Sequence, residues 1–142
     1  MKRNHPKGAA ALEFAIGAPV VMTMFIGGFV LVYAAFTKER LTTATIQATR
    51  ICAMRPANEN QANLGNCVRN AGVGLMGDDN ARCQGGAGFV TQQVGDPRDP
   101  RQISMLRVTG QCTYLSPVWP NRLPPMNLIA EARMPRLPMA GP

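Results

Sequence analysis

The residues able to do covalent or metal chemistry are few and widely spaced. Four cysteines, Cys52, Cys67, Cys83 and Cys112, are separated by 15, 16 and 29 residues, and the single histidine is His5. Protein zinc sites are built from close pairs such as Cys-x-x-Cys or from several histidines, and this sequence contains neither. We therefore expect no bound metal and no cofactor.

The acidic residues do not suggest an active site. Asp78, Asp79, Asp96 and Asp99 lie in segments rich in glycine, asparagine and proline, far from any histidine that would serve as a base. Asp78-Asp79-Asn80 is a weak calcium candidate, but it lacks EF-hand spacing, and a solvated turn is the favoured interpretation. A nucleophile paired with a base is absent from the pattern, so we expect no enzymatic activity.

The cysteines are better explained as structural crosslinks. All four follow a long apolar run, as expected for a domain in an oxidising compartment, where each disulfide contributes about 2 to 4 kcal/mol. The alternative is four reduced thiols in a cytosolic domain. Four cysteines allow three pairings. We favour Cys67 with Cys83, and Cys52 on a helix with Cys112 on a strand packed over it.

The dominant feature of the sequence is an uncharged segment from Phe14 to Thr37. It is long enough to cross a bilayer as a helix of about 20 residues. We predict one helix from Ala9 to about residue 54, with the membrane segment at about 14–37. The alternative is a conventional signal peptide cut near Ala34 or Ala35, although the run exceeds a usual signal-peptide core and Glu13 interrupts the apolar helix predicted from Ala9.

After Lys38 the pattern becomes amphipathic. The apolar residues recur at spacings of three and four, which predicts a helix face made by Leu41, Ala44, Ala48 and Ile51. A second helix is predicted around Leu64 to Leu75, where apolar residues again follow helical spacing. Pro56 and the polar stretch after it separate the two helices.

The remainder of the chain predicts three strands. They are Phe89 to Val94, Ile103 to Leu115 with its alternating apolar residues, and Leu128 to Met134. The predicted fold class is therefore α+β, with a long N-terminal helix packed on a small antiparallel sheet. The predicted organisation is a leader at 1–8, the long helix at 9–54 and a small disulfide-bonded domain at 55–142.

The charge distribution suggests an orientation and argues against nucleic acid. The chain has 15 Lys and Arg against 8 Asp and Glu, a formal net charge of +7. Lys2, Arg3 and Lys7 precede the apolar run, which favours a cytoplasmic N-terminus and a C-terminal domain on the other side of the membrane in a single-pass protein, although Lys38 and Arg40 on the far side weaken the asymmetry. The other basic residues form no stripe with aromatic side chains, so no nucleic acid is expected as a partner.

Glu13 is the one charge in the apolar helix and a candidate functional residue. If the chain is cut after Gly8, Glu13 becomes the fifth residue of the mature protein and Ala9 carries a new α-amino group. In a helical assembly, the carboxylate of one subunit can then neutralise the amine of its neighbour. The alternative is that Glu13 is simply a solvated residue at a helix end.

The segment G-A-A-A-L-E-F-A-I-G-A-P, which begins at Gly8, resembles the N-terminus of type IV pilins and pseudopilins, and more narrowly TadE-like proteins of tight-adherence (Tad/Flp, type IVc) pilus systems. The resemblance implies cleavage between Gly8 and Ala9 by a prepilin peptidase, and assembly through Glu13, Phe14 and the apolar helix. It also implies, as partners, other pilin and pseudopilin subunits, the inner-membrane pilus assembly platform and the lipid bilayer.

Two departures bear on the role within such a system. Position 14 is Phe where major Flp pilins have Tyr, and the soluble body is far larger than theirs. These differences favour a minor pilin or pseudopilin. Such a protein would be stored in the membrane before it joins an extracellular filament. The alternative from another class is a secreted or membrane-anchored disulfide-bonded binding module, for which Trp119 would be a candidate partner contact.

Overall fold

The computed structural model describes residues 7–55, 60–95, 104–116 and 124–136, with side chains from Ala11 onward. Pro56, Asp96, Asp99 and Trp119 lie outside the described residues. The elements are, in chain order, α1 (Lys7–Ala53), α2 (Gln61–Met76), the short 3-10 helix η1 (Gly77–Arg82), β1 (Gly88–Val94), β2 (Met105–Tyr114) and β3 (Met126–Pro135). The predicted α+β class, with a long N-terminal helix on a small antiparallel sheet, is confirmed.

The helix α1 is 47 residues long and contains Pro19. It begins at Lys7, so Lys7 and Gly8 are helical, whereas the sequence predicted that the helix begins at Ala9. The alanines that follow have the highest helix propensity, and adding a residue to an existing helix costs far less than starting one. The helix therefore extends across the predicted cleavage site.

One continuous stripe of α1 is buried by the rest of the protein. It begins well before Lys38, where the sequence placed the change to an amphipathic pattern. Its buried members are Val30, Ala34, Thr37, Leu41, Ala44, Thr45, Ala48, Thr49, Cys52 and Ala53. The prediction that Ile51 belongs to this face is wrong, because its side chain is 52% exposed and Cys52 takes its place.

Three threonines lie in this buried stripe. The hydroxyl groups of Thr37, Thr45 and Thr49 donate to the carbonyl oxygens of Tyr33, Leu41 and Thr45, one turn earlier. A buried hydroxyl without a partner would destabilise the fold, and this bond to the helix's own backbone satisfies it. Polar residues can therefore occupy the core face of α1.

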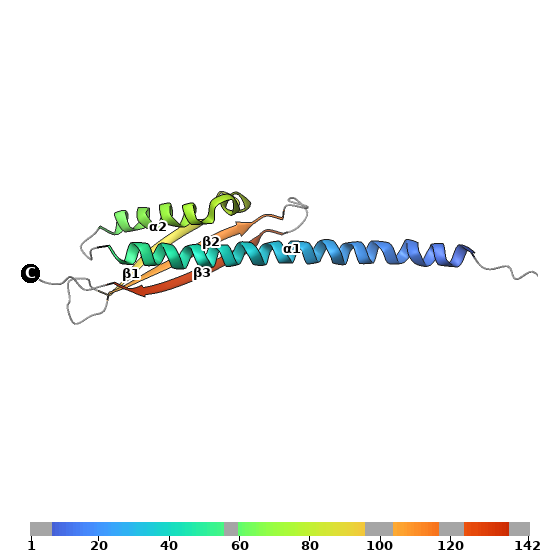
Figure 1. The fold of residues 1–142 in the computed structure, drawn as a ribbon, viewed down its shortest axis with the longest axis horizontal. Helices are drawn as coiled ribbons and strands as arrows, with labels where there is room; N and C mark the ends of the chain where they lie inside the picture. Colours follow the sequence, from blue (N-terminus) through green and yellow to red (C-terminus); the bar gives the residue numbers. More distant parts are fainter. Residues whose placement is uncertain (1–6, 56–59, 96–103, 117–123, 137–142) are drawn as a thin grey trace, which may run out of the picture.

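The three strands form one antiparallel sheet in the order β1-β2-β3. Figure 1 shows both helices on the same side of this sheet. The helix α1 contacts β2 and β3, and α2 contacts β1. Alternate residues of β2, such as Leu106, Val108 and Cys112, point to the helices and are buried. We refer to the sheet with α2, η1 and the C-terminal half of α1 as the body.

Two glycines allow the layers to approach each other. A Cβ atom at Gly72 of α2 would lie 2.6 Å from the ring of Phe89 on β1. A Cβ atom at Gly110 of β2 would meet the hydroxyl of Thr45 and the side chain of Leu41 on α1. The absent side chains are thus what let Phe89 fill the space between α2 and the sheet.

Candidate assembly and membrane surface

The N-terminal half of α1 projects alone beyond the body (Figure 1). From Ala11 to Phe29 every described side chain is exposed except Ala18 and Ile26, which are half-buried. This segment of about 19 residues is roughly 28 Å long, close to the thickness of a bilayer's hydrocarbon core. By length and composition, the part of α1 from Ala11 to Ala53 could cross a membrane, as many signal sequences also could.

Glu13 and Phe14 lie on this projecting segment. Both side chains are exposed, Phe14 by 75%. Gly8 and Ala9 lie in the first turn of α1. Ala9 and Glu13 are four residues apart on the helix and therefore share a face. The structure thus leaves Glu13 and Phe14 accessible to a neighbouring molecule, while the body provides neither of them with a contact among the described residues.

The exposed apolar surface of α1 ends at different positions along the two faces of the helix. On the face toward the body, burial begins at Val30 and continues through Ala34 and Thr37. On the opposite face, large apolar side chains remain exposed as far as Phe36, and the first charged residue on that face after Glu13 is Glu39. Sequence reasoning missed this difference, because an unbroken apolar run has no polar contrast to reveal which face is covered.

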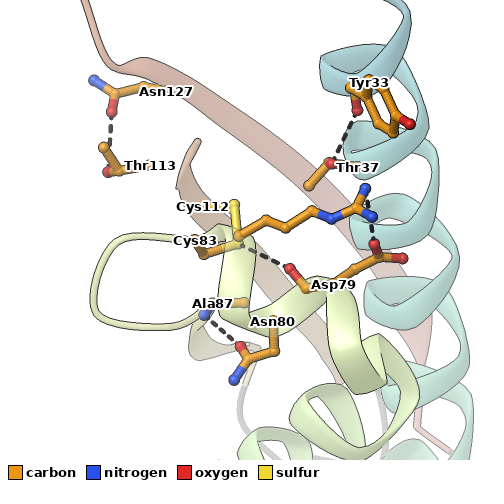
Figure 2. The surroundings of a disulfide bond; sticks show 10 residues. Tyr33, Thr37, Asp79, Asn80, Cys83, Ala87, Cys112, Thr113 and Asn127 are labelled. Atoms are coloured by element: carbon orange, nitrogen blue, oxygen red, sulfur yellow. Dashed lines mark hydrogen bonds and ion pairs between the residues drawn. A yellow bond between two sulfur atoms is a disulfide. The ribbon is translucent and has the colours of Figure 1, made fainter. Parts of the chain in front are cut away.

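A charged cluster joins α1 to η1 where the body begins, as Figure 2 shows in part. Arg82 Nη1 lies 3.3 Å from the Asp79 carboxylate, and Arg40 Nε lies 3.9 Å from the same carboxylate. The Arg82 guanidinium also lies over the Tyr33 ring, 5.4 Å from its centre, within cation–π range. Burial raises the pKa of the Tyr114 hydroxyl, and the positive charge of Arg82 partly offsets this rise.

The weak calcium candidate is committed to internal contacts. The Asp79 carboxylate is used by Arg82 and Arg40, and Asn80 Oδ1 accepts a hydrogen bond from the Ala87 N–H at 2.7 Å (Figure 2). No group of three or more metal-binding side chains occurs in the described part of the chain. Asp79 and Asn80 therefore shape the η1 turn.

All four cysteines are paired, but not as favoured from the sequence. The disulfides are Cys52–Cys67, which joins the end of α1 to α2, and Cys83–Cys112, which joins the residue after η1 to β2 (Figure 2). The preference for Cys67 with Cys83 and Cys52 with Cys112 is wrong.

The direction of β2 relative to α1 explains this correction. Arg136, whose N–H pairs with Ser104 just before β2, also reaches the carbonyl of Arg55 at the end of α1, so β2 starts at that end. It then runs back along α1, and Gly110 already lies against Leu41 and Thr45. Cys112, two residues farther along β2, is thus about 20 Å from the level of Cys52, too far for a disulfide.

The sheet face away from the helices carries an ion-pair cluster. Arg107 Nη2 donates to Glu131 at 2.9 Å, and Arg133 pairs with the other oxygen of the same carboxylate. These hydrogen bonds, first from Arg107 and then from Arg133, lower the pKa of Glu131 below its usual value. Val90 and Ile129 beside the cluster are apolar and more than half exposed.

A long helix with a free apolar half, whose other half packs on a small antiparallel sheet, defines a pilin-like α+β protein. The family model for the TadE-like protein matches residues 8–50, which covers most of α1. The predicted TadE-like resemblance is confirmed over these residues. No curated protein and no solved structure matches the chain.

The match and the apolar helix together support a pilin-like role associated with a Tad pilus. They imply association with pilus components in general, and the helix is compatible with a membrane anchor. The matched region ends at Arg50, so α2 and the sheet lie outside it.

Proposed function

We propose that this protein is a minor pilin or pseudopilin of a Tad/Flp-type pilus that is stored in the inner membrane and enters the assembly through α1. The observation that carries the proposal is the projecting apolar half of α1, which bears a single accessible carboxylate one turn after Ala9, within a TadE-like match. The protein acts by packing and has no catalytic step.

Packing between apolar helices and charge neutralisation have separate roles in this proposal. Helices in lipid associate through close van der Waals contacts, for which Phe14 and its apolar neighbours are available. Glu13 adds specificity, because a carboxylate in an apolar environment is costly unless it meets a positive partner. Cleavage by a prepilin peptidase between Gly8 and Ala9 would supply that partner as the Ala9 amine of a neighbouring subunit.

The disulfides support a periplasmic body. Cys52–Cys67 and Cys83–Cys112 would form and persist in the oxidising periplasm. With the body there, the basic N-terminal residues remain on the cytoplasmic side. The partners of the proposed protein are then the lipid bilayer, the prepilin peptidase, the inner-membrane assembly platform and other pilin subunits.

The alternative of a binding module released by signal peptidase has less support from the structure. Its predicted cleavage site, near Ala34 or Ala35, lies within α1 where Ala34 is 6% exposed and Thr37 is fully buried. Cutting there would remove Val30 and Ala34 from the buried stripe and interrupt the helix on which the sheet packs.

The proposal is tested by Glu13→Gln in cells that assemble the pilus. Gln keeps the size of the side chain and removes the charge, so we expect normal membrane abundance and loss of the protein from sheared filaments. Glu39→Gln is the matched control, because Glu39 is also exposed on α1 but lies beside the body. Equal filament incorporation of the Glu13→Gln variant and the wild type would overturn the role of Glu13.

A further inference from the structure

The exposed apolar surface of α1 ends at different levels on its two faces. This uneven boundary indicates how the helix is oriented in the bilayer, which the proposed membrane storage alone does not specify. The apolar surface ends at Val30 on the face covered by the body and at Phe36 on the opposite face, which we call the outward face. These levels differ by about six residues, or about 9 Å along the axis. One plane perpendicular to the helix cannot separate apolar from charged surface on both faces.

Between the levels of Val30 and Phe36, the outward face exposes apolar side chains that are suited to an apolar solvent. Leu31, Val32 and Phe36 are 65%, 52% and 59% exposed, and no charged residue lies between Glu13 and Lys38. This surface continues without a break from the projecting segment that the proposed function places in lipid. Tyr33, at the edge of the same surface, has the apolar ring and polar hydroxyl typical of residues at the membrane interface.

The body prevents the simplest arrangement, an upright helix immersed as far as Phe36. In that arrangement the start of the body would enter the bilayer with the charged groups of Asp79 and Arg82, which lie beside Tyr33 and Arg40. Charged side chains are strongly disfavoured in hydrocarbon. An upright helix immersed only to Val30 instead leaves Leu31, Val32 and Phe36 in water.

A tilted helix can place the exposed apolar side chains of the outward face in lipid and still keep the charged groups of the body out of the hydrocarbon. A rise of about 9 Å across a helix about 10 to 12 Å wide corresponds to a tilt of roughly 40° from the bilayer normal. That is at the upper end of the range found for transmembrane helices. We infer that phospholipid is the partner of the outward face from Leu31 to Phe36, and that α1 crosses the bilayer strongly tilted, with its body-facing side lifted toward the headgroups. This inference rests on the proposed membrane location.

Three positions along the outward face can each carry a fluorescent probe at a different depth. Phe29, Phe36 and Thr43 are spaced by seven residues, so they share a face, and all three are exposed. In a Trp119→Phe background, the full-length variants Phe29→Trp, Phe36→Trp and Thr43→Trp are reconstituted at low density in phosphatidylcholine vesicles containing lipids brominated at defined depths. We expect quenching and blue-shifted emission at positions 29 and 36, and neither at 43.

A second pair measures the tilt directly. Thr23 lies on the body-facing side, seven residues before buried Val30, whereas Phe25 lies on the outward face, seven residues before Val32. In an upright helix, Trp at position 23 is about 3 Å deeper than Trp at position 25. A tilt of roughly 40° reverses this order and places position 25 deeper by roughly 5 Å. Lipids brominated near the bilayer centre should therefore quench Phe25→Trp more strongly than Thr23→Trp.

The outcomes separate the inference from the proposed function. Absence of quenching at position 25 by any brominated lipid would contradict the membrane location itself. Strong quenching at position 25 with a water-like, unquenched Trp at position 36 would overturn the inference and favour the upright helix. Blue-shifted emission at position 36 without lipid quenching would also overturn it, because another protein surface, such as a second copy, would then cover the face.

The unsubstituted protein provides a second measurement if the Trp119→Phe background does not fold. The wild-type chain is reconstituted with a phospholipid that carries a photoreactive diazirine in its acyl chain, and adducts are mapped by mass spectrometry. We expect adducts at Leu31, Val32 or Phe36 in addition to the projecting segment. Adducts that stop at Phe29 would overturn the inference.

Discussion

Gly72 shows how one missing side chain allows the two layers to meet. A methyl group there would lie 2.6 to 2.8 Å from three ring atoms of Phe89, whereas a methyl group at Gly74, in the same helix, would meet nothing. We expect Gly72→Ala to lower the free energy of unfolding by about 1 to 3 kcal/mol through overpacking. Gly74→Ala should instead raise it by up to about 1 kcal/mol, because Ala favours the helix.

Denaturant unfolding of the detergent-solubilised full-length variants measures both changes. Equal effects of the two substitutions would show that Phe89 moves aside without cost. In the sequence alone, the two glycines differ in nothing but position, and both have a low helix propensity. Gly72 could not be assigned a packing role, because its partner Phe89 lies on β1 and is brought near by the tertiary fold.

Glu131 gives the sheet a predictable response to acid. Hydrogen bonds from Arg107 and Arg133 lower its pKa in the folded state, so the ionised form stabilises the fold. That contribution is fully present above the ordinary pKa of about 4.5 and is lost as the pH falls through the lowered folded-state value. We expect Glu131→Gln to be less stable than wild type at pH 7, and the difference to vanish once the pH has fallen below the lowered folded-state pKa.

Thermal unfolding of both proteins across this pH range tests the expectation. Other carboxylates titrate in both proteins, so the difference between the two curves isolates Glu131. A difference that stays constant with pH would mean that packing of the side chain, rather than its charge, accounts for the effect.

At the scale of elements, the course of the helices and strands determines which cysteines are close enough to pair. Cys52–Cys67 closes the turn between α1 and α2, and Cys83–Cys112 fixes η1 to the end of β2. Digestion without reduction, followed by mass spectrometry, should yield these two linked peptide pairs. Cys52 linked to Cys112 would contradict the antiparallel course of β2 along α1.

Removing either disulfide should weaken the body substantially. The closed loops of 15 and 29 residues predict a loss of about 3 kcal/mol each, slightly more for the longer loop. The double variants Cys52→Ser with Cys67→Ser and Cys83→Ser with Cys112→Ser avoid leaving one thiol to mispair. Their denaturation midpoints should fall by similar amounts, and an unchanged midpoint would show that packing alone holds that junction.

The bounds of the helices and strands were largely predictable from the sequence. Which elements pack against each other, and through which face, was not. Helical spacing located α1 and α2, and alternation with turn residues located β1, β2 and β3 to within about three residues at each end. Local periodicity contains this information. The wrong disulfide preference and the wrong placement of Ile51 have a common cause, since both depend on the direction and rotation of elements that are distant in the sequence.

At the scale of the whole molecule, the first turn of α1 is the decisive place for the proposed function. We expect the mature protein isolated from membranes to begin at Ala9, and intact-mass measurement will show whether residues 1–8 have been removed. Retention of Met1 would contradict processing by a prepilin peptidase. A terminus near Phe36 would instead support the secreted binding module.

The candidate assembly surface was predictable in part. Glu13 and Phe14 were identified from an interrupted apolar run and from the resemblance, and the structure leaves both exposed. The burial that begins at Val30 was not predictable, because Val, Ala, Leu and Phe suit lipid and protein interiors equally well. Only the position of the sheet along α1 distinguishes the two environments.

The Cys52–Cys67 bond also has a mechanical consequence. It lies at the end of α1 farthest from the projecting segment. A force that pulls α1 along its axis loads its contacts with β2 and β3 in shear, all at once, instead of peeling them apart one by one. The covalent bond to α2 at the trailing end then prevents the helix from sliding out of the body. Tension applied through the N-terminal segment is therefore transmitted to the whole folded unit.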